Sequence, residues 1–245
     1  MRALIFAAGI GSRLKPWTDF HPKALVDIGG KPMLERVIEK IINAGIKDII
    51  INVHHFADQI RNFVNEHNFE ARITFSDETN LLLETGGGLR KALDLIGDDA
   101  VLVHNADILS DFNIVSMIEE HKSSGADITL LTQDRKTSRY FVFGEEGLLK
   151  GWTNITSGQV RPESLTITSY DTLKAFNGVH IINPSAYPLL KEYKPQDEPF
   201  SIVDFYIEYC SILQIHSYNL PENKSWFDIG KPETLEKARL MALKS

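Results

Sequence analysis

The chain has 245 residues, of which 43% are apolar, 24% charged and 9% aromatic, and this composition is typical of a globular protein. Its length suits one domain or two. Lys and Arg total 26 against 33 Asp and Glu, and the resulting net charge of −7 argues against nonspecific binding to nucleic acid or an anionic membrane. Any phosphate-bearing partner must therefore be bound by locally placed basic residues.

The number of cysteines and the length of the apolar runs indicate the cellular compartment of the protein. The single cysteine, Cys210, excludes an intrachain disulfide framework and a cysteine-rich zinc site. The first apolar run, residues 3–8, ends at Gly9 and is too short for a signal peptide. No other run approaches the roughly 20 apolar residues that cross a bilayer. We therefore expect a cytoplasmic protein with neither a nucleic-acid nor a membrane partner.

The first half of the chain alternates short Ile- and Val-rich runs with segments whose apolar residues recur at three and four positions. The runs predict strands at residues 3–8, 48–53, 72–75 and 101–104. The spaced segments predict a helix from Met33 that stops at Gly45, and further helices over residues 56–67 and 88–96. This alternation predicts a largely parallel sheet covered by helices.

The second half continues the pattern and then becomes less regular. We expect a helix over residues 115–121 and a strand over 128–132, followed by short antiparallel strands at 140–143, 148–152 and 165–168. A further strand over 176–182 is closed by Asn183-Pro184. Helical spacing returns from Phe200 to Leu213, and Pro232 opens a final helix. The tail has no hexapeptide periodicity, so we expect no C-terminal β-helix domain.

The loop after the first strand, residues 7–16 (AAGIGSRLKP), is the most informative segment. Glycines directly after a buried strand allow the backbone to approach a ligand and to point N–H groups at phosphate oxygens. The spacing fits neither the dinucleotide-binding fingerprint, which needs a glycine at Leu14, nor a Walker A loop. Arg13 is placed to bind a departing pyrophosphate. The segment predicts a phosphate-binding loop.

Two carboxylates far apart in the chain are candidate metal ligands. Asp107 follows the apolar strand AVLVH at the carboxyl edge of the sheet, where open α/β sheets bind ligands. Asp228 lies between apolar neighbours near the other end of the chain. Mg²⁺ accepts one or two carboxylates together with substrate phosphates. The pair therefore predicts a Mg²⁺ site.

The composite of AAGIGSRLKPWT, HPKAL with Lys23, and GGKPML resembles the N-terminal signature of the sugar-1-phosphate nucleotidyltransferases. The resemblance implies a Rossmann-like three-layer α/β sandwich with a mostly parallel central sheet and a small antiparallel sugar-binding subregion. It also implies that the glycine-rich loop wraps a nucleoside triphosphate, that Arg13 contacts its β and γ phosphates and Lys23 its α-phosphate, and that Asp107 and Asp228 hold the metal. Arg13, Lys23, Asp107 and Asp228 are then the catalytic residues.

Leu83-Glu84-Thr85-Gly86-Gly87-Gly88 resembles the base-recognition loop of the same family, although Glu84 replaces the usual glycine. The LETGGG form is similar to that of N-acetylmuramate 1-phosphate uridylyltransferases. Ala106 replaces the glycine that usually precedes the first metal-binding aspartate. The nucleotide-binding residues implied by the resemblance are Ala7, Ala8, Gly9, Gly11, Ser12, Arg13, Lys23, Glu84, Thr85, Gly86, Gly87 and Asn105.

On the sugar side, residues 176–179 (FNGV) resemble the family strand whose glycine lies against the sugar phosphate. The Glu-Lys-Pro of many hexose-1-phosphate enzymes is absent, and the corresponding region reads Trp152-Thr153-Asn154. This absence weakens assignment to the glucose and mannose branches. We expect Asn177, Gly178 and Lys174 to bind the sugar.

The sequence therefore predicts an enzyme that transfers a nucleotidyl group, with UTP favoured, to a sugar 1-phosphate, with N-acetylmuramate 1-phosphate favoured. The alternatives are a mannose- or heptose-1-phosphate guanylyltransferase and a noncatalytic nucleotide-sugar sensor. Because Arg13 and Asp107 must meet Asp228, we expect a single domain over residues 1–245. Its nucleotide-binding part spans about 1–135, its sugar-binding part spans about 136–245, and the protein is a monomer or homodimer.

Overall fold

The computed structural model describes residues 1–242 and contains one ten-stranded sheet and one two-stranded sheet. The strands of the large sheet are β1 (Arg2–Phe6), β2 (Asp48–Val53), β3 (Arg72–Asp77), β4 (Val101–Asn105), β6 (Ile128–Gln133), β7 (Arg139–Phe143), β8 (Leu149–Asn154), β9 (Gln159–Arg161), β10 (Thr172–Ile182) and β11 (Ile215–Asn219). The small sheet pairs β5 (Ile108–Ser110) with β12 (Trp226–Asp228). The helices are α1 (Met33–Asn43), α2 (Ala57–Glu66), α3 (Glu84–Ile96), α4 (Ile114–Ser124), α5 (Tyr187–Glu192), α6 (Ile202–Tyr209) and α7 (Pro232–Ala242).

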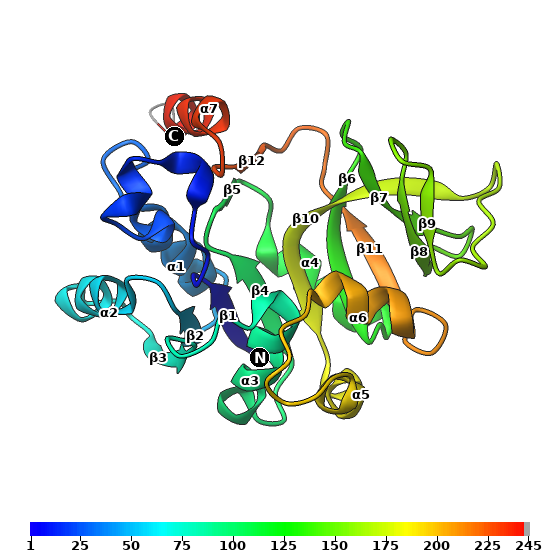
Figure 1. Ribbon diagram of the computed structural model, residues 1–245, viewed down its shortest axis with the longest axis horizontal. Helices are drawn as coiled ribbons and strands as arrows, with labels where there is room; N and C mark the ends of the chain where they lie inside the picture. Colours follow the sequence, from blue (N-terminus) through cyan, green and yellow to red (C-terminus); the bar gives the residue numbers. More distant parts are fainter. Residues whose placement is uncertain (243–245) are drawn as a thin grey trace.

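The large sheet is parallel over its first half and mixed over its second (Figure 1). Strands β3, β2, β1 and β4 lie side by side and run parallel. Strand β10 runs antiparallel to both β4 and β6, and β11 pairs parallel with β6. The first residues of β10 extend beyond this region and pair with β7, which begins the antiparallel ribbon of β7, β8 and β9. These pairings confirm the predicted α/β class, with its mostly parallel sheet and small antiparallel subregion.

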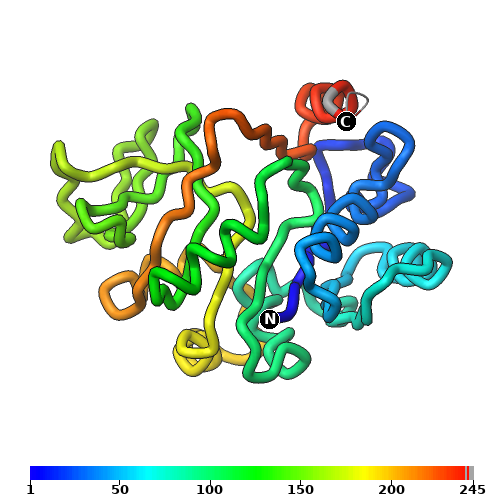
Figure 2. Tube along the Cα trace, turned by 180° about the vertical axis from the view of Figure 1, so that it is seen from behind, coloured from blue at the N-terminus to red at the C-terminus, as the bar shows by residue number. Residues whose placement is uncertain are grey.

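Helices cover both faces of the sheet because the buried strands alternate their side chains between two apolar clusters. In β1, Ala3 and Ile5 pack with residues of α1, α2 and α4, whereas Leu4 packs with residues of α3, α5 and α6. Figure 1 shows α3, α5 and α6 in front of the sheet, and Figure 2, from behind, shows α1 and α4 on the opposite face. The predicted three-layer sandwich is confirmed.

Several elements differ from the sequence-based expectation. Strands β5, β9, β11 and β12 and helix α5 were not expected, because they are short or lack a regular apolar pattern. The strand expected over residues 165–168 is wrong, since no strand is formed there. Leu165 instead packs against β8, with its Cδ2 3.0 Å from where a β-carbon on Gly151 would lie. Its apolar character therefore reflects packing of a loop rather than strand pairing.

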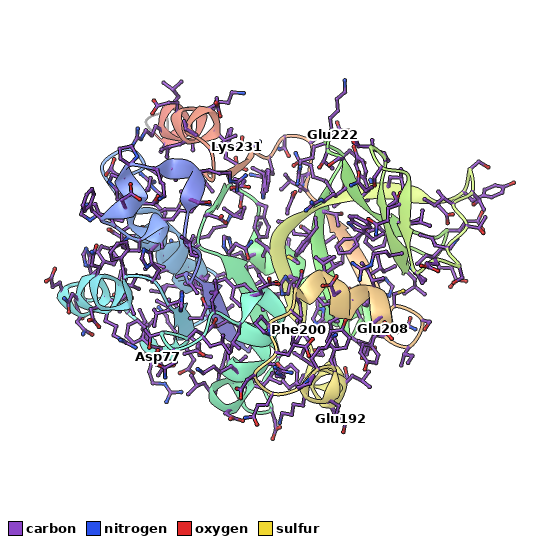
Figure 3. All side chains as sticks on the ribbon, in the orientation of Figure 1. Asp77, Glu192, Phe200, Glu208, Glu222 and Lys231 are labelled. Carbon is purple, nitrogen blue, oxygen red and sulfur yellow. The ribbon has the colours of Figure 1, made fainter. Side chains whose placement is uncertain are left out.

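Helix α3 begins at Glu84, four residues before the start expected at Gly88. The three glycines are therefore the first turns of a buried helix rather than an open loop. A β-carbon on Gly86 would lie 2.2 Å from the ring of Phe200, and the amide of Gly86 donates to the Phe200 carbonyl over 2.8 Å. Phe200, labelled in Figure 3, precedes α6. Glycine at position 86 thus allows α3 and the segment before α6 to touch.

This contact predicts that Gly86→Ala lowers the free energy of unfolding by about 1–3 kcal/mol, because overpacking outweighs the gain in helix propensity. Urea unfolding followed by circular dichroism measures the change. Gly9→Ala is the matched control, since a β-carbon there meets no atom within 4 Å, and it should change stability by less than about 0.5 kcal/mol. Equal stability of the two variants would contradict this account of the glycine.

Candidate functional site

A cavity of about 370 Å³ lies at the carboxyl ends of β1 and β4 and extends to the first turn of α3. Parallel strands bring their following loops to one edge, which is where ligands bind in open α/β sheets. Eight of the residues predicted to bind nucleotide or metal line this cavity, namely Ala7, Ala8, Gly9, Lys23, Glu84, Thr85, Asn105 and Asp107. The sequence-predicted loops therefore converge on one volume.

The β5–β12 pair places the second carboxylate beside the first. Asp228 is opposite Ile108 in the small sheet, and the amide of Ile229 donates to the Asp107 carbonyl over 3.0 Å. The Lys23 ammonium donates to Asp107 Oδ2 and lies 3.8 Å from Asp228 Oδ1. Two carboxylates separated by 120 residues of sequence thus share one cation.

Lys23 belongs to a short turn and is held under the glycine-rich loop. Its side chain is only 10% exposed, and a β-carbon on Gly11 would lie 2.9 Å from Lys23 Cβ. Gly11 itself has φ of 69°, a left-handed conformation in which glycine is favoured. The loop therefore packs directly on the lysine that contacts both carboxylates.

Arg13 lies at the exposed rim of this cluster. Its Nη2 atom is 2.7 Å from where a β-carbon on Gly230 would be, and Lys23 Nζ and Asp228 Oδ1 are 3.0 and 2.7 Å from the same point. Among residues 1–242, no carboxylate oxygen lies within 4.0 Å of the Arg13 guanidinium. The guanidinium is thus placed beside the cluster with its charge available to an anion.

The donor set suits a divalent cation that also binds substrate. Within residues 1–242 no group of three or more His, Cys, Asp or Glu side chains could hold a metal ion by itself. Asp107 and Asp228 together provide two hard carboxylates that already share a positive group, Lys23. Mg²⁺ retains waters and takes one or two carboxylates plus phosphate oxygens, so this pair fits Mg²⁺ bound with a phosphate ligand.

A buried polar network supports the floor of the cavity. The Asn52 amide oxygen accepts from the amides of Ala7 and Ala8 over 2.7 and 3.2 Å, and its Nδ2 donates to Glu78 over 2.8 Å. Glu78, 1% exposed, also accepts from the Leu83 amide over 3.1 Å. One chain of hydrogen bonds therefore joins the glycine-rich loop to the start of α3.

Sequence reasoning missed both members of this network. The available signal was Asn52 itself, a polar residue inside the apolar run DIIINV at the carboxyl end of a strand, because a buried amide needs hydrogen-bond partners. Glu78 carried no comparable signal, since it follows the strand RITFSD, in which polar residues are already frequent. The network also restricts the loop, because the amides of Ala7 and Ala8 are already bonded.

Five predicted nucleotide-binding residues do not line the cavity, namely Gly11, Ser12, Arg13, Gly86 and Gly87. Ser12 is exposed at the loop rim, and Gly86 and Gly87 donate their amides to the Phe200 carbonyl over 2.8 and 3.3 Å. Gly11 is also outside the lining, and its carbonyl accepts from Thr18 over 2.9 Å. These residues shape the loops that carry the lining residues.

The predicted sugar-side residues lie in three different settings. Gly178 has φ of 73° and contacts Asn105, whose Nδ2 is 2.7 Å from where a β-carbon on Gly178 would be. The Asn177 side chain is fully buried and accepts from Arg135 over 3.4 Å. Lys174 is paired with the exposed Asp134 over 2.7 Å. The structure therefore places Gly178 beside Asn105 of the cavity lining, whereas Lys174 lies in a surface ion pair.

Arg135 is a further basic residue near the carboxylates that sequence reasoning missed. Its guanidinium stacks over the Trp226 ring at 4.6 Å and donates to the Phe176 carbonyl over 3.1 Å. Burial lowers the pKa of Arg135, and the negative charge of Asp228 opposes this shift. Arg135 is identified only by its contact with Trp226 of β12 in the folded chain, so no local sequence motif predicts it.

Comparison with known proteins identifies the family. A model of the family described as nucleotidyl transferase matches residues 2–245. The chain belongs to this family of enzymes, as the resemblance of its motifs predicted.

Two curated relatives differ in substrate. An N-acetylmuramate alpha-1-phosphate uridylyltransferase of Caulobacter vibrioides is 38% identical over 108 residues, covering 43% of this chain and 45% of that protein. A mannose-1-phosphate guanyltransferase of Schizosaccharomyces pombe is 30% identical over 241 residues, covering 95% of this chain and 62% of that protein. The chain thus aligns with less than two thirds of the length of either relative.

Solved structures share the fold. HddC from Yersinia pseudotuberculosis superposes with a TM-score of 0.78 at 23% identity, covering 98% of this chain and 99% of that one. A UDP-glucose pyrophosphorylase from Acinetobacter baumanii gives a TM-score of 0.77 at 19% identity, covering 98% of this chain and 92% of that one.

Across residues 1–242, no helix has the length and apolarity to cross a bilayer.

The polar network predicts that Asn52→Leu lowers the free energy of unfolding by about 2 kcal/mol or more, because buried backbone N–H groups lose their partner at about 1–3 kcal/mol each. Equilibrium unfolding in urea measures the loss. Asn80→Leu, at an exposed position, is the matched control and should stay close to wild type. Comparable stability of the two variants would rule out the structural role of Asn52.

Burial raises the pKa of Glu78, while hydrogen bonds from Asn52 and Leu83 oppose the shift. A carboxyl whose folded pKa exceeds its unfolded value of 4.5 stabilises the fold below pH 4.5, and this contribution disappears as pH rises through the folded pKa. The stability of wild type relative to Glu78→Gln should therefore fall as pH is raised from 4.5. Urea unfolding of both proteins between pH 4.5 and 7.5 tests the sign, and a rise with pH would contradict it.

Proposed function

We propose that the protein transfers a nucleotidyl group from a nucleoside triphosphate to a sugar 1-phosphate and releases pyrophosphate. The observation that carries this proposal is the meeting of Asp107, Asp228 and Lys23 beside the cavity, with Arg13 at its rim. A noncatalytic nucleotide-sugar sensor would not require two carboxylates from distant parts of the chain to converge there. We also propose that both halves of the chain form one catalytic domain, since the cluster draws on each.

The proposed reaction needs positioning and charge stabilisation rather than a covalent intermediate. An oxygen of the sugar 1-phosphate attacks the α-phosphorus in line, a new P–O bond forms, and the bond to the β-phosphate oxygen breaks. Lys23 offsets negative charge at the α-phosphate, and Arg13 binds the departing pyrophosphate. Because the amides of Ala7 and Ala8 donate to Asn52, the amides that bind phosphate are those farther along the loop.

We propose Mg²⁺ as the cofactor, with Asp107 and Asp228 as its protein ligands. When bound, Mg²⁺ would neutralise charge on the reacting phosphates. Lys23 Nζ already lies between these carboxylates, so the lysine keeps the pair from repelling each other before substrate arrives. The lysine must then contact phosphate as well as carboxylate during the reaction.

We favour UTP and N-acetylmuramate 1-phosphate as substrates. The LETGGG segment supports this choice, as does 38% identity to the Caulobacter uridylyltransferase over 108 residues. The second candidate is a mannose-1-phosphate guanylyltransferase, which is supported by 30% identity over 241 residues to the fission yeast protein. The two candidates share the catalytic cluster and differ in the base and in the sugar.

A substrate panel separates these candidates. UTP, GTP, CTP and dTTP are each combined with N-acetylmuramate 1-phosphate and with mannose 1-phosphate, and pyrophosphate release is measured. We expect the highest kcat/KM for UTP with N-acetylmuramate 1-phosphate. A preference for GTP with mannose 1-phosphate would favour the second candidate, and nucleotide binding without pyrophosphate release from any pair would favour the sensor.

Removal of a charged partner of the phosphates should reduce the reaction strongly. Arg13→Ala, Asp107→Ala and Asp228→Ala should each lower kcat/KM by at least about 10²-fold, as loss of one preorganised charge partner commonly does. Asp58→Ala, on the exposed surface of α2, is the control and should keep wild-type activity. Retained activity of Asp228→Ala at saturating Mg²⁺ would refute the assignment of that carboxylate.

A further inference from the structure

The β5–β12 pair, which carries Asp228, depends on other elements for its position. It has three rungs of opposing residues, from Ile108 opposite Asp228 to Ser110 opposite Trp226, and its two strands come from distant parts of the chain. A two-stranded ribbon is at best marginally stable in water. The contacts that hold the outer rung, Ser110 opposite Trp226, therefore help to decide where Asp228 lies.

Lys40, near the end of α1, holds the outer rung through Ser110. Its Nζ atom donates to the Ser110 carbonyl over 2.6 Å and to Ser110 Oγ over 3.0 Å. The same atom lies 4.1 Å from the centroid of the Phe112 ring, which is 2% exposed. One ammonium group thus fixes both the main chain and the side chain of the residue opposite Trp226.

Trp226 holds the same rung through the other strand. Its Nε1–H donates to the Asn177 carbonyl over 3.0 Å, and the Arg135 guanidinium lies over its ring at 4.6 Å. The outer rung is therefore attached to α1 through Ser110 and to β10 through Trp226. Because a strand rises about 3.3 Å per residue, Asp228 follows this attachment at a distance of only about 7 Å along β12.

The Lys40 ammonium is costly to keep in this place. Within residues 1–242, no carboxylate oxygen lies within 4.0 Å of its Nζ atom. Burial lowers the pKa of Lys40 to about 7, Lys224 adds to this shift, and Asp111 opposes it. An apolar side chain would fill the same space without such a cost. The contribution of the ammonium therefore lies in its two directional hydrogen bonds to Ser110.

We propose that Lys40 is a positioning residue for the reaction: through Ser110 it fixes the outer rung of the β5–β12 pair, and through this pair it fixes Asp228 beside Asp107. Trp226 completes the attachment from β12. The inference rests on the proposed function. Lys40 is not part of the cluster of Asp107, Asp228 and Lys23, so it acts on the chemistry only through the strand pair.

Hydrogen exchange measured by mass spectrometry tests the attachment in the protein without substrate or metal. Lys40→Met keeps an unbranched side chain and loses the hydrogen-bond donors. Amides of residues 108–110 and 226–228 should exchange at least about 10-fold faster in this variant, whereas those of β2 should exchange as in wild type, because the opening is local. Trp226→Phe, which keeps a ring and loses the Nε1–H donor, should change exchange in the same direction.

Ile60→Val is the matched control. It removes one methyl group from a buried side chain of α2, which lies away from β5 and β12 (Figure 1), and so destabilises the core without touching the strand pair. Exchange of residues 108–110 and 226–228 should stay as in wild type. Equal exchange of these residues in wild type, Lys40→Met and Trp226→Phe would overturn the positioning role.

Pyrophosphate release at saturating Mg²⁺ connects the attachment to the chemistry. Lys40→Met should lower kcat at least about 10-fold, because a small displacement of a reacting group is costly. The KM values of both substrates should change by less than about 2-fold, since their binding residues are untouched. Ile60→Val should keep the wild-type kcat.

The two measurements separate this inference from the proposed function. Faster exchange of the pair in Lys40→Met with an unchanged kcat would overturn the positioning role alone, as would a loss of kcat that Ile60→Val reproduces. Faster exchange in Lys40→Met, with a wild type that releases no pyrophosphate from any pair of substrates, would overturn the proposed function alone.

Discussion

The site depends on the pairing of two three-residue strands, β5 and β12, which places Asp228 beside Asp107. Without this pair the last part of the chain would have no fixed position relative to the carboxyl edge of β4. Two carboxylates held this close repel each other unless a cation lies between them, and Lys23 provides that cation. The lysine is in turn held under the glycine-rich loop. The same few contacts therefore connect the first strand, the central strand and the end of the chain.

A second constraint acts on the floor of the cavity. Asn52 and Glu78 connect the loop after β1 to the start of α3 through buried hydrogen bonds. A buried polar network is costly in a low-dielectric interior when one member is left without a partner. The members of this network therefore hold one another in place. Gly88 makes room for it, because a β-carbon there would lie 2.7 Å from the Glu78 carboxylate. The loop after β1 and the start of α3 are thus joined in one hydrogen-bonded floor.

Most of the large sheet could be predicted from sequence, because buried parallel strands such as β2 are continuous apolar runs. The convergence of Asp107 and Asp228 was also predictable, since both stand in recognisable motifs. The glycines before Gly88 were misread as part of a loop, because their role depends on Phe200, more than a hundred residues away. Glu78 and Arg135 act through tertiary contacts alone, which local patterns do not encode, whereas Asn52 was marked only as a polar residue inside the apolar run DIIINV.

The basic residues of the site are placed so that phosphate binding does not depend on the net charge of this acidic chain. In the proposed reaction, Arg13 and Lys23 serve the phosphates. The central claim is that Asp107 and Asp228 act as one unit, and a double-mutant cycle on kcat/KM tests it most directly. We predict that Asp107→Asn with Asp228→Asn costs little more than the more damaging single substitution. Multiplicative losses would show that the two carboxylates act independently and would contradict the shared site.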